Sequence, residues 1–107
     1  RSLTNRVIIQ SFDHRSLRTI REIDSNIRLA ALTTDGEAKL DVYAAYQFNI
    51  WSPNQRDVTA ELVNKAHDEG LLVIPWTVNE AAEMRQLIDW GVDGIISDYP
   101  DRLLALP

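Results

Sequence analysis

Residues 59–97, TAELVNKAHDEGLLVIPWTVNEAAEMRQLIDWGVDGIIS, decide the fold class of this chain. Thr59 is placed to cap a helix, and Gly70 stands where that helix would end. The apolar run 71–78 that follows is long enough for a fully buried strand. Pro75 inside this run removes one backbone donor, which counts against a regular central strand.

The alternation of helix and strand continues toward the C-terminus. Asn79 is predicted to cap a helix over 80–90. Residues 94–97, GIIS, predict a short buried strand, and Asp98 or Tyr99 is placed to cap a last helix. The order of these elements gives repeated strand-then-helix units.

The N-terminal half shows the same pattern less clearly. Asp13 is placed to cap a helix whose apolar face has Leu17, Ile20 and Ile23. The expected elements are, in order, a buried strand over 6–12, a helix over 14–24, a strand over 27–33, a weaker helix over 37–46 and a short strand over 48–51.

The predicted strands are continuous apolar runs rather than alternating apolar and polar residues. Such runs are typical of parallel strands that are covered on both faces. The fold class is therefore α/β, either an open doubly wound sheet or part of a (βα) barrel.

Composition excludes several classes of partner. Sixteen acidic residues outnumber eleven basic ones, for a formal net charge of -5, so nucleic acid and anionic membrane surfaces should repel the chain. Cysteine is absent, which excludes disulfides and thiolate metal sites. No apolar run approaches the roughly 20 residues that span a bilayer. We expect no nucleic-acid partner and no integral membrane segment.

The start of the chain bears on its origin and location. Its first residue is Arg1 rather than methionine, and no basic-then-apolar leader follows, so no signal peptide is predicted. The sequence does not decide the compartment; the preferred expectation is cytoplasmic over periplasmic or secreted.

Ligands of parallel α/β proteins bind beyond the carboxyl ends of the strands. Trp76 at such an end is a candidate for a pocket wall, with core packing as the alternative. Catalytic groups are scarce, because Ser11 has no visible base and no lysine ends a strand. Capping better explains Asp13, Asn79 and Asp98, a surface position explains His67, and packing explains Trp51 and Trp90. His14 lies in the first turn of a predicted helix, and no catalytic role is assigned to it.

Three segments are distinctive: VIIQSFD at 7–13, ELVNKAHDEGLLVIPWTVN at 61–79 and GVDGIISDYPDRL at 91–103. Through these segments the chain resembles the C-terminal half of the glycerophosphodiester phosphodiesterase family over nearly its whole length. Two small departures are Ser97, where the family more often has threonine, and Ser52, where asparagine is common.

The resemblance implies a TIM-type (βα) barrel, of which residues 1–107 would form the C-terminal half with four to five strands. It implies hydrolysis of glycerophosphodiesters to glycerol 3-phosphate and an alcohol, with a divalent cation, Mg or Ca. The family's metal-binding and proton-transfer motifs belong to its N-terminal half and do not occur here. The resemblance therefore assigns this chain no catalytic residue and no metal ligand, and it implies that the chain alone is inactive. Phe12 and Trp76 match the family's substrate-pocket aromatics.

Two expectations follow from a half barrel. Four strands in the absent half would bring the total to nine, so one of the runs 27–33 and 48–51 is expected not to be a barrel strand. A half barrel also exposes unpaired strand edges, which favours self-association or pairing with a complementary half. The alternative function is a non-enzymatic binding or assembly module.

Overall fold

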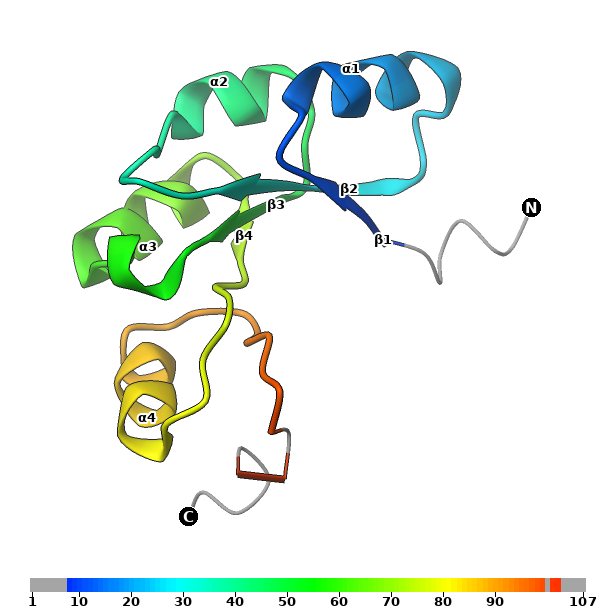
Figure 1. Ribbon diagram of the computed structural model, residues 1–107. Coiled ribbons are helices and arrows are strands. Elements are labelled where there is room, and N and C mark those ends of the chain that lie inside the picture. Colours follow the sequence, from blue (N-terminus) through cyan, green and yellow to red (C-terminus); the bar gives the residue numbers. More distant parts are fainter. Residues whose placement is uncertain (1–7, 100, 103–107) are drawn as a thin grey trace.

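The computed structural model describes residues 8–99 and 101–102. Its centre is a four-stranded sheet in the order β1-β2-β3-β4, in which every neighbouring pair is parallel (Figure 1). Because the strand order follows the chain order, the described part has no reversal of the kind that defines a doubly wound sheet. The strands are β1 (Ile8–Ser11), β2 (Arg28–Thr33), β3 (Ile50–Pro53) and β4 (Leu72–Val73).

Helices connect the strands, and local capping sets where several of them begin. The Asp13 side chain accepts a hydrogen bond from the Arg15 N–H, and the Thr59 side chain accepts one from the Leu62 N–H. Gly70 has a φ of +84°, as expected for a residue that ends a helix. These three predictions are confirmed. The helices are α1 (His14–Ile23), α2 (Leu40–Ala45), the 3-10 turn η2 (Gln55–Asp57), α3 (Ala60–Asp68) and α4 (Ala81–Asp89).

The core lies between the sheet and its helices. Leu29, Ala31, Trp51 and Val73 point to this side from the strands, and none of them has any exposed surface. Leu17 reaches the same cluster from α1. The packing prediction for Trp51 is thereby confirmed.

The other face of the sheet is open and hollowed. A cavity of about 310 Å³ lies over it. Successive residues of a strand point to opposite faces of the sheet, so residues two apart along a strand point to the same face. The cavity is lined by Ile8, Gln10, Ala30, Ile50, Ser52, Ile74 and Ile96.

Burial of the N-terminal elements differs from the prediction. The expected strand over 6–12 exists as β1, but it alternates between exposed and half-buried residues instead of being buried. Within the described residues it pairs with β2 alone, which makes it an edge strand. Ile23, expected on the apolar face of α1, is 80% exposed because it is the last residue of that helix.

The strand count also needs correction. Both 27–33 and 48–51 overlap paired strands, β2 and β3, so the expectation that one of them lies outside the sheet is wrong. The run 71–78 yields only the two-residue β4, because Pro75 lacks an N–H for the ladder.

The run 94–97 is not a regular strand. It lies beside the residues that follow β4 through single hydrogen bonds, from the Ile96 N–H to the Pro75 carbonyl at 3.0 Å and from the Val78 N–H to the Ile96 carbonyl at 2.9 Å. The last helix, expected after Asp98 or Tyr99, falls mostly outside the described residues. No described helix is long and apolar enough to cross a bilayer.

Candidate functional site at the carboxyl edge of the sheet

Two aromatic side chains meet at the carboxyl edge of the sheet. Phe12 follows β1 and Trp76 lies just beyond β4, and their rings are 5.7 Å apart in an edge-to-face arrangement. The Trp76 indole N–H donates to the Ser52 carbonyl at 2.9 Å, which fixes the orientation of the half-buried ring. Phe12 is 57% exposed. The two predicted substrate-binding residues thus lie together, and their binding role stays a prediction.

The aromatic pair lies on the same face of the sheet as the cavity. Phe12 is two residues beyond Gln10, and Trp76 is two residues beyond Ile74; both of these earlier residues line the cavity. A ligand at this edge would lie near the two aromatic rings and the amide of Gln10.

Asn79 does not have the predicted capping role. Helix α4 begins at Ala81, and no side chain caps it. The Asn79 side-chain oxygen instead accepts from the Ser97 hydroxyl at 3.2 Å and from the Asp98 N–H at 3.0 Å. Its amide nitrogen donates to an Asp98 carboxylate oxygen at 3.3 Å. Asn79 therefore fastens residues 97–98 to the segment that follows Trp76.

Arg102 also stabilises the segment around Asn79. The Arg102 guanidinium donates to the Asn79 carbonyl at 2.8 Å, lies 3.7 Å from a Glu80 carboxylate oxygen and stacks over the Tyr99 ring at 4.2 Å. The sequence offered no signal for this arrangement, since an arginine near a chain end is usually solvated.

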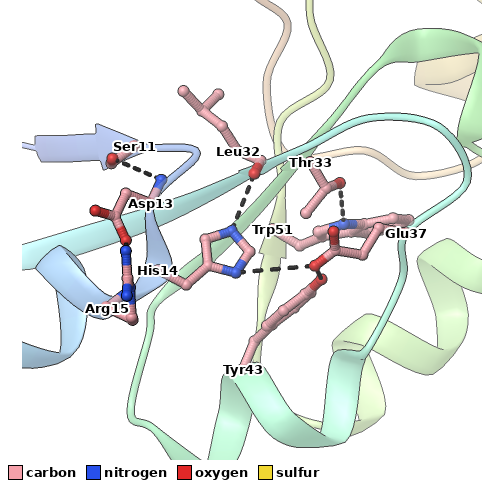
Figure 2. A network of polar contacts seen from close by, with 9 residues as sticks. All are labelled: Ser11, Asp13, His14, Arg15, Leu32, Thr33, Glu37, Tyr43 and Trp51. Carbon is pink, nitrogen blue, oxygen red and sulfur yellow. Dashed lines mark hydrogen bonds and ion pairs between the residues drawn. The ribbon is translucent and has the colours of Figure 1, made fainter.

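A polar network joins α1 to the loop that follows β2 (Figure 2). The His14 Nε2 lies 3.0 Å from the Leu32 carbonyl oxygen, and its Nδ1 lies 3.9 Å from Glu37 Oε2. The Tyr43 hydroxyl donates to the same Glu37 oxygen at 2.9 Å. Burial, and then the neighbouring Glu37 carboxylate, raises the pKa of Tyr43, so this hydroxyl stays a donor at neutral pH. Sequence reasoning missed this network.

The hydroxyl and carboxylate after β1 serve local structure. The Ser11 hydroxyl accepts from the Asp13 N–H at 2.9 Å, and an Asp13 carboxylate oxygen accepts from the Ser16 hydroxyl at 3.1 Å. The Ser16 hydrogen bond holds the pKa of Asp13 below its usual value. Both contacts belong to the helix cap, and neither brings a base to Ser11.

A divalent cation would need oxygen or imidazole ligands in one place. Among residues 8–99 and 101–102, no three acidic or histidine side chains gather closely enough to bind one. At the carboxyl edge, the Asp98 carboxylate is engaged by Asn79. The described side chains therefore do not fit a metal centre by themselves.

Solved structures define the fold class. A glycerophosphodiester phosphodiesterase from Parabacteroides distasonis aligns with a TM-score of 0.86 at 21% identity, over 96% of this chain and 43% of that one. A phosphodiesterase from Oleispira antarctica, solved in complex with sn-glycerol-3-phosphate, aligns with a TM-score of 0.83 at 17% identity. These neighbours are TIM barrels, and the described chain corresponds to part of one. The predicted (βα) barrel class is confirmed.

The sequence then gives the family. The model of the Glycerophosphoryl diester phosphodiesterase family matches residues 1–102, so the chain belongs to that family. It is 33% identical to a glycerophosphodiester phosphodiesterase from Bacillus altitudinis over 97% of this chain and 44% of the relative. A structure from Silicibacter pomeroyi, provisionally named for the same activity, aligns at 36% identity with a TM-score of 0.82, over 89% of this chain and 35% of that one. The chain thus spans less than half of these relatives.

Proposed function

We propose that residues 1–107 form the C-terminal half of a barrel whose complete protein hydrolyses glycerophosphodiesters to glycerol 3-phosphate and an alcohol. Family membership supports the reaction class. The contribution of this chain to the substrate pocket is supported by the pair of Phe12 and Trp76 at the carboxyl edge of the sheet, where ligands of (βα) barrels bind.

In this proposal Phe12 and Trp76 form the apolar wall of the substrate pocket. Their edge-to-face contact and the bond from Trp76 to the Ser52 carbonyl hold the wall in place before substrate arrives. Such preorganisation lowers the entropy lost on binding. The rings would contact the carbon-bearing part of the diester rather than its phosphate.

The divalent cation, Mg or Ca, would be bound by residues outside this chain. The family resemblance supports this division, because it implies that the metal-binding motifs belong to the N-terminal half of the barrel. When bound, such a cation polarises the phosphoryl oxygens. The chain alone would contribute pocket wall and structural support, and we expect it to be inactive.

The test has two parts. The chain is first assayed alone with glycerophosphocholine and Mg²⁺ or Ca²⁺, and we expect no turnover. A hybrid is then made in which this chain replaces the matching 44% of the Bacillus altitudinis relative. We expect the hybrid to hydrolyse glycerophosphocholine, and Trp76→Ala to raise its KM about tenfold because a buried contact worth about 1.4 kcal/mol is lost.

Matched variants separate binding from folding in this test. Trp76→Phe keeps an apolar ring and should lose less affinity than Trp76→Ala. Ile23→Ala removes an apolar side chain that is 80% exposed and far from the edge, so its KM should be unchanged. Turnover by the chain alone at the rate of a full-length relative, or an unchanged KM in Trp76→Ala, would contradict the proposal.

The second candidate is a non-enzymatic module that assembles through its open sheet face. Ile8, Phe12 and Leu72 are exposed by 47%, 57% and 46% on that face, and β1 has a free outer edge within the described residues. Apolar side chains beside an unpaired strand favour association. We expect the isolated chain to self-associate or to pair with a complementary barrel half.

Sedimentation measurements over a range of concentrations test this expectation. We expect the average mass to exceed 12.2 kDa as concentration rises, and Ile8→Lys to reduce that excess because a charge on an edge strand opposes pairing. Ile23→Lys, which adds the same charge to an exposed site elsewhere, is the control. A chain that stays monomeric at high concentration counts against association.

A further inference from the structure

The His14 ring lies between two hydrogen-bond acceptors, the Leu32 carbonyl near Nε2 and the Glu37 carboxylate near Nδ1 (Figure 2). Its Nε2 is 3.0 Å from the Leu32 carbonyl oxygen. A carbonyl oxygen only accepts hydrogen bonds, so Nε2 must bear the hydrogen. The neutral ring is thereby restricted to one tautomer, and its side chain is only 20% exposed.

The other ring nitrogen then faces a second acceptor. In the neutral Nε2–H tautomer, Nδ1 has a lone pair and no hydrogen. It lies 3.9 Å from Glu37 Oε2, and an ionised carboxylate is also an acceptor. The Tyr43 hydroxyl keeps that oxygen in position from the other side at 2.9 Å. Nδ1 and Glu37 attract each other only when the ring takes up a second proton.

Polar, aromatic and charged groups from several elements surround the ring. Arg18, four residues further along α1, stacks over the Tyr46 ring at 4.2 Å. Strand β2 presents the Leu32 carbonyl, the following loop presents Glu37, and α2 presents Tyr43, whose ring centroid is 5.3 Å from the imidazole. Phe48 contributes an apolar ring at 6.0 Å. On α1 itself, Arg15 pairs with Asp13 instead of His14. Glu37 is the one ionised partner of the ring among the described ion pairs.

We propose that His14 is a proton-dependent clasp, which fastens loop 34–39 to the first turn of α1 when its Nδ1 takes up a proton from solvent. The loop connects β2 to α2 at the carboxyl edge, and its turn at Asp35 and Gly36 has φ values of 57° and 80°. Residue 14 follows Phe12 by two positions. Acidification would therefore tighten the part of the edge that includes Phe12.

The direction of the pH effect follows from the two charges. The clasp forms as pH falls through the range where histidine is protonated, and it is lost again when Glu37 becomes neutral. This inference concerns loop 34–39 alone and does not depend on the proposed hydrolase activity.

Nuclear magnetic resonance of the chain tests the clasp. His67→Gln leaves His14 as the sole histidine, since the chain has two. At high pH the ring ¹⁵N shifts should report the Nε2–H tautomer. As pH falls, the backbone amides of 35–38 should titrate with the same midpoint as the His14 ring. A ring in the Nδ1–H tautomer, or amides that do not follow it, would overturn the proposal.

Two substitutions give a second reading. Glu37→Gln still accepts from Tyr43 but cannot form an ion pair with the ring, so it should reduce the linked amide shifts by at least about half. Glu61→Gln removes the same charge from an exposed site on α3 and should leave the linked amide shifts unchanged. Linked shifts that persist in Glu37→Gln, or disappear in Glu61→Gln, would rule the clasp out.

Discussion

Trp51→Ala should lower the free energy of unfolding by about 3–5 kcal/mol, as expected for a large side chain lost from a well-packed core. Trp51 has no exposed surface, and it lies between Ala31 and Val73 on the neighbouring strands. The small side chain of Ala31 leaves room for the indole. Urea denaturation measures the change.

The indole N–H adds a polar component that a second pair of variants isolates. It donates to the Thr33 hydroxyl at 2.9 Å, and Thr33 is only 1% exposed. Trp51→Phe keeps much of the apolar volume but leaves this hydroxyl without its donor, at a cost of about 1–3 kcal/mol. Adding Thr33→Val should recover part of that loss. A Trp51→Ala variant destabilised by less than about 1 kcal/mol would contradict the central position of Trp51.

Asp93→Ala should lower the free energy of unfolding by about 2 kcal/mol, because it leaves a buried N–H unpaired at the edge of the sheet. An Asp93 carboxylate oxygen accepts from the Val73 N–H at 2.8 Å, and the Asp93 N–H donates to the Val73 carbonyl at 2.8 Å. Asp93 thus satisfies both backbone groups of Val73, where a further strand would otherwise pair. His67 Nε2 contacts the same carboxylate oxygen at 2.7 Å.

Three comparisons sharpen the Asp93 measurement. Asp93→Asn keeps one acceptor and should lose about half as much stability. His67→Ala removes a partly exposed pair and should lose less than about 1 kcal/mol. Asp89→Ala removes an equal charge from an exposed site and should change stability by less than about 0.5 kcal/mol. Equal losses in His67→Ala and Asp93→Ala would show that the imidazole contact, rather than the Val73 bond, is the important one.

Local signals in the sequence predicted the elements well. Asp13 and Thr59 cap helices because the side chain and the N–H it binds are two or three residues apart. The apolar runs located all four strands because each run is itself a local feature of the sequence. The burial of β1 was mispredicted because burial depends on which strands lie beside it. A run of apolar residues looks the same in the sequence whether its strand lies at the edge of a sheet or in the middle.

The candidate site was predicted only in part. Trp76 was a pocket candidate from its place at the end of a strand, and a family resemblance added Phe12; the structure brings the two together. Asn79 was assigned to the wrong partner, since its true contacts at Ser97 and Asp98 lie 18 and 19 residues away. His14 was missed for the same reason, because its contact at Leu32 is 18 residues distant. Side-chain contacts between residues this far apart in the sequence leave no periodic pattern in it.

The aromatic pair has a consequence for how the molecule folds. Its members stand at the ends of the first and the last strand, whereas each neighbouring pair of strands is separated by only about one βα unit. Each strand pairing closes a short loop, while the Phe12 and Trp76 contact closes a loop that spans all four strands and bears a larger entropic cost of closure. The indole of Trp76 is already oriented by its hydrogen bond to the Ser52 carbonyl on β3. The ring contact therefore links the two outermost strands, and loosening the pairing of β1 with β2 would separate Phe12 from an indole that stays in place.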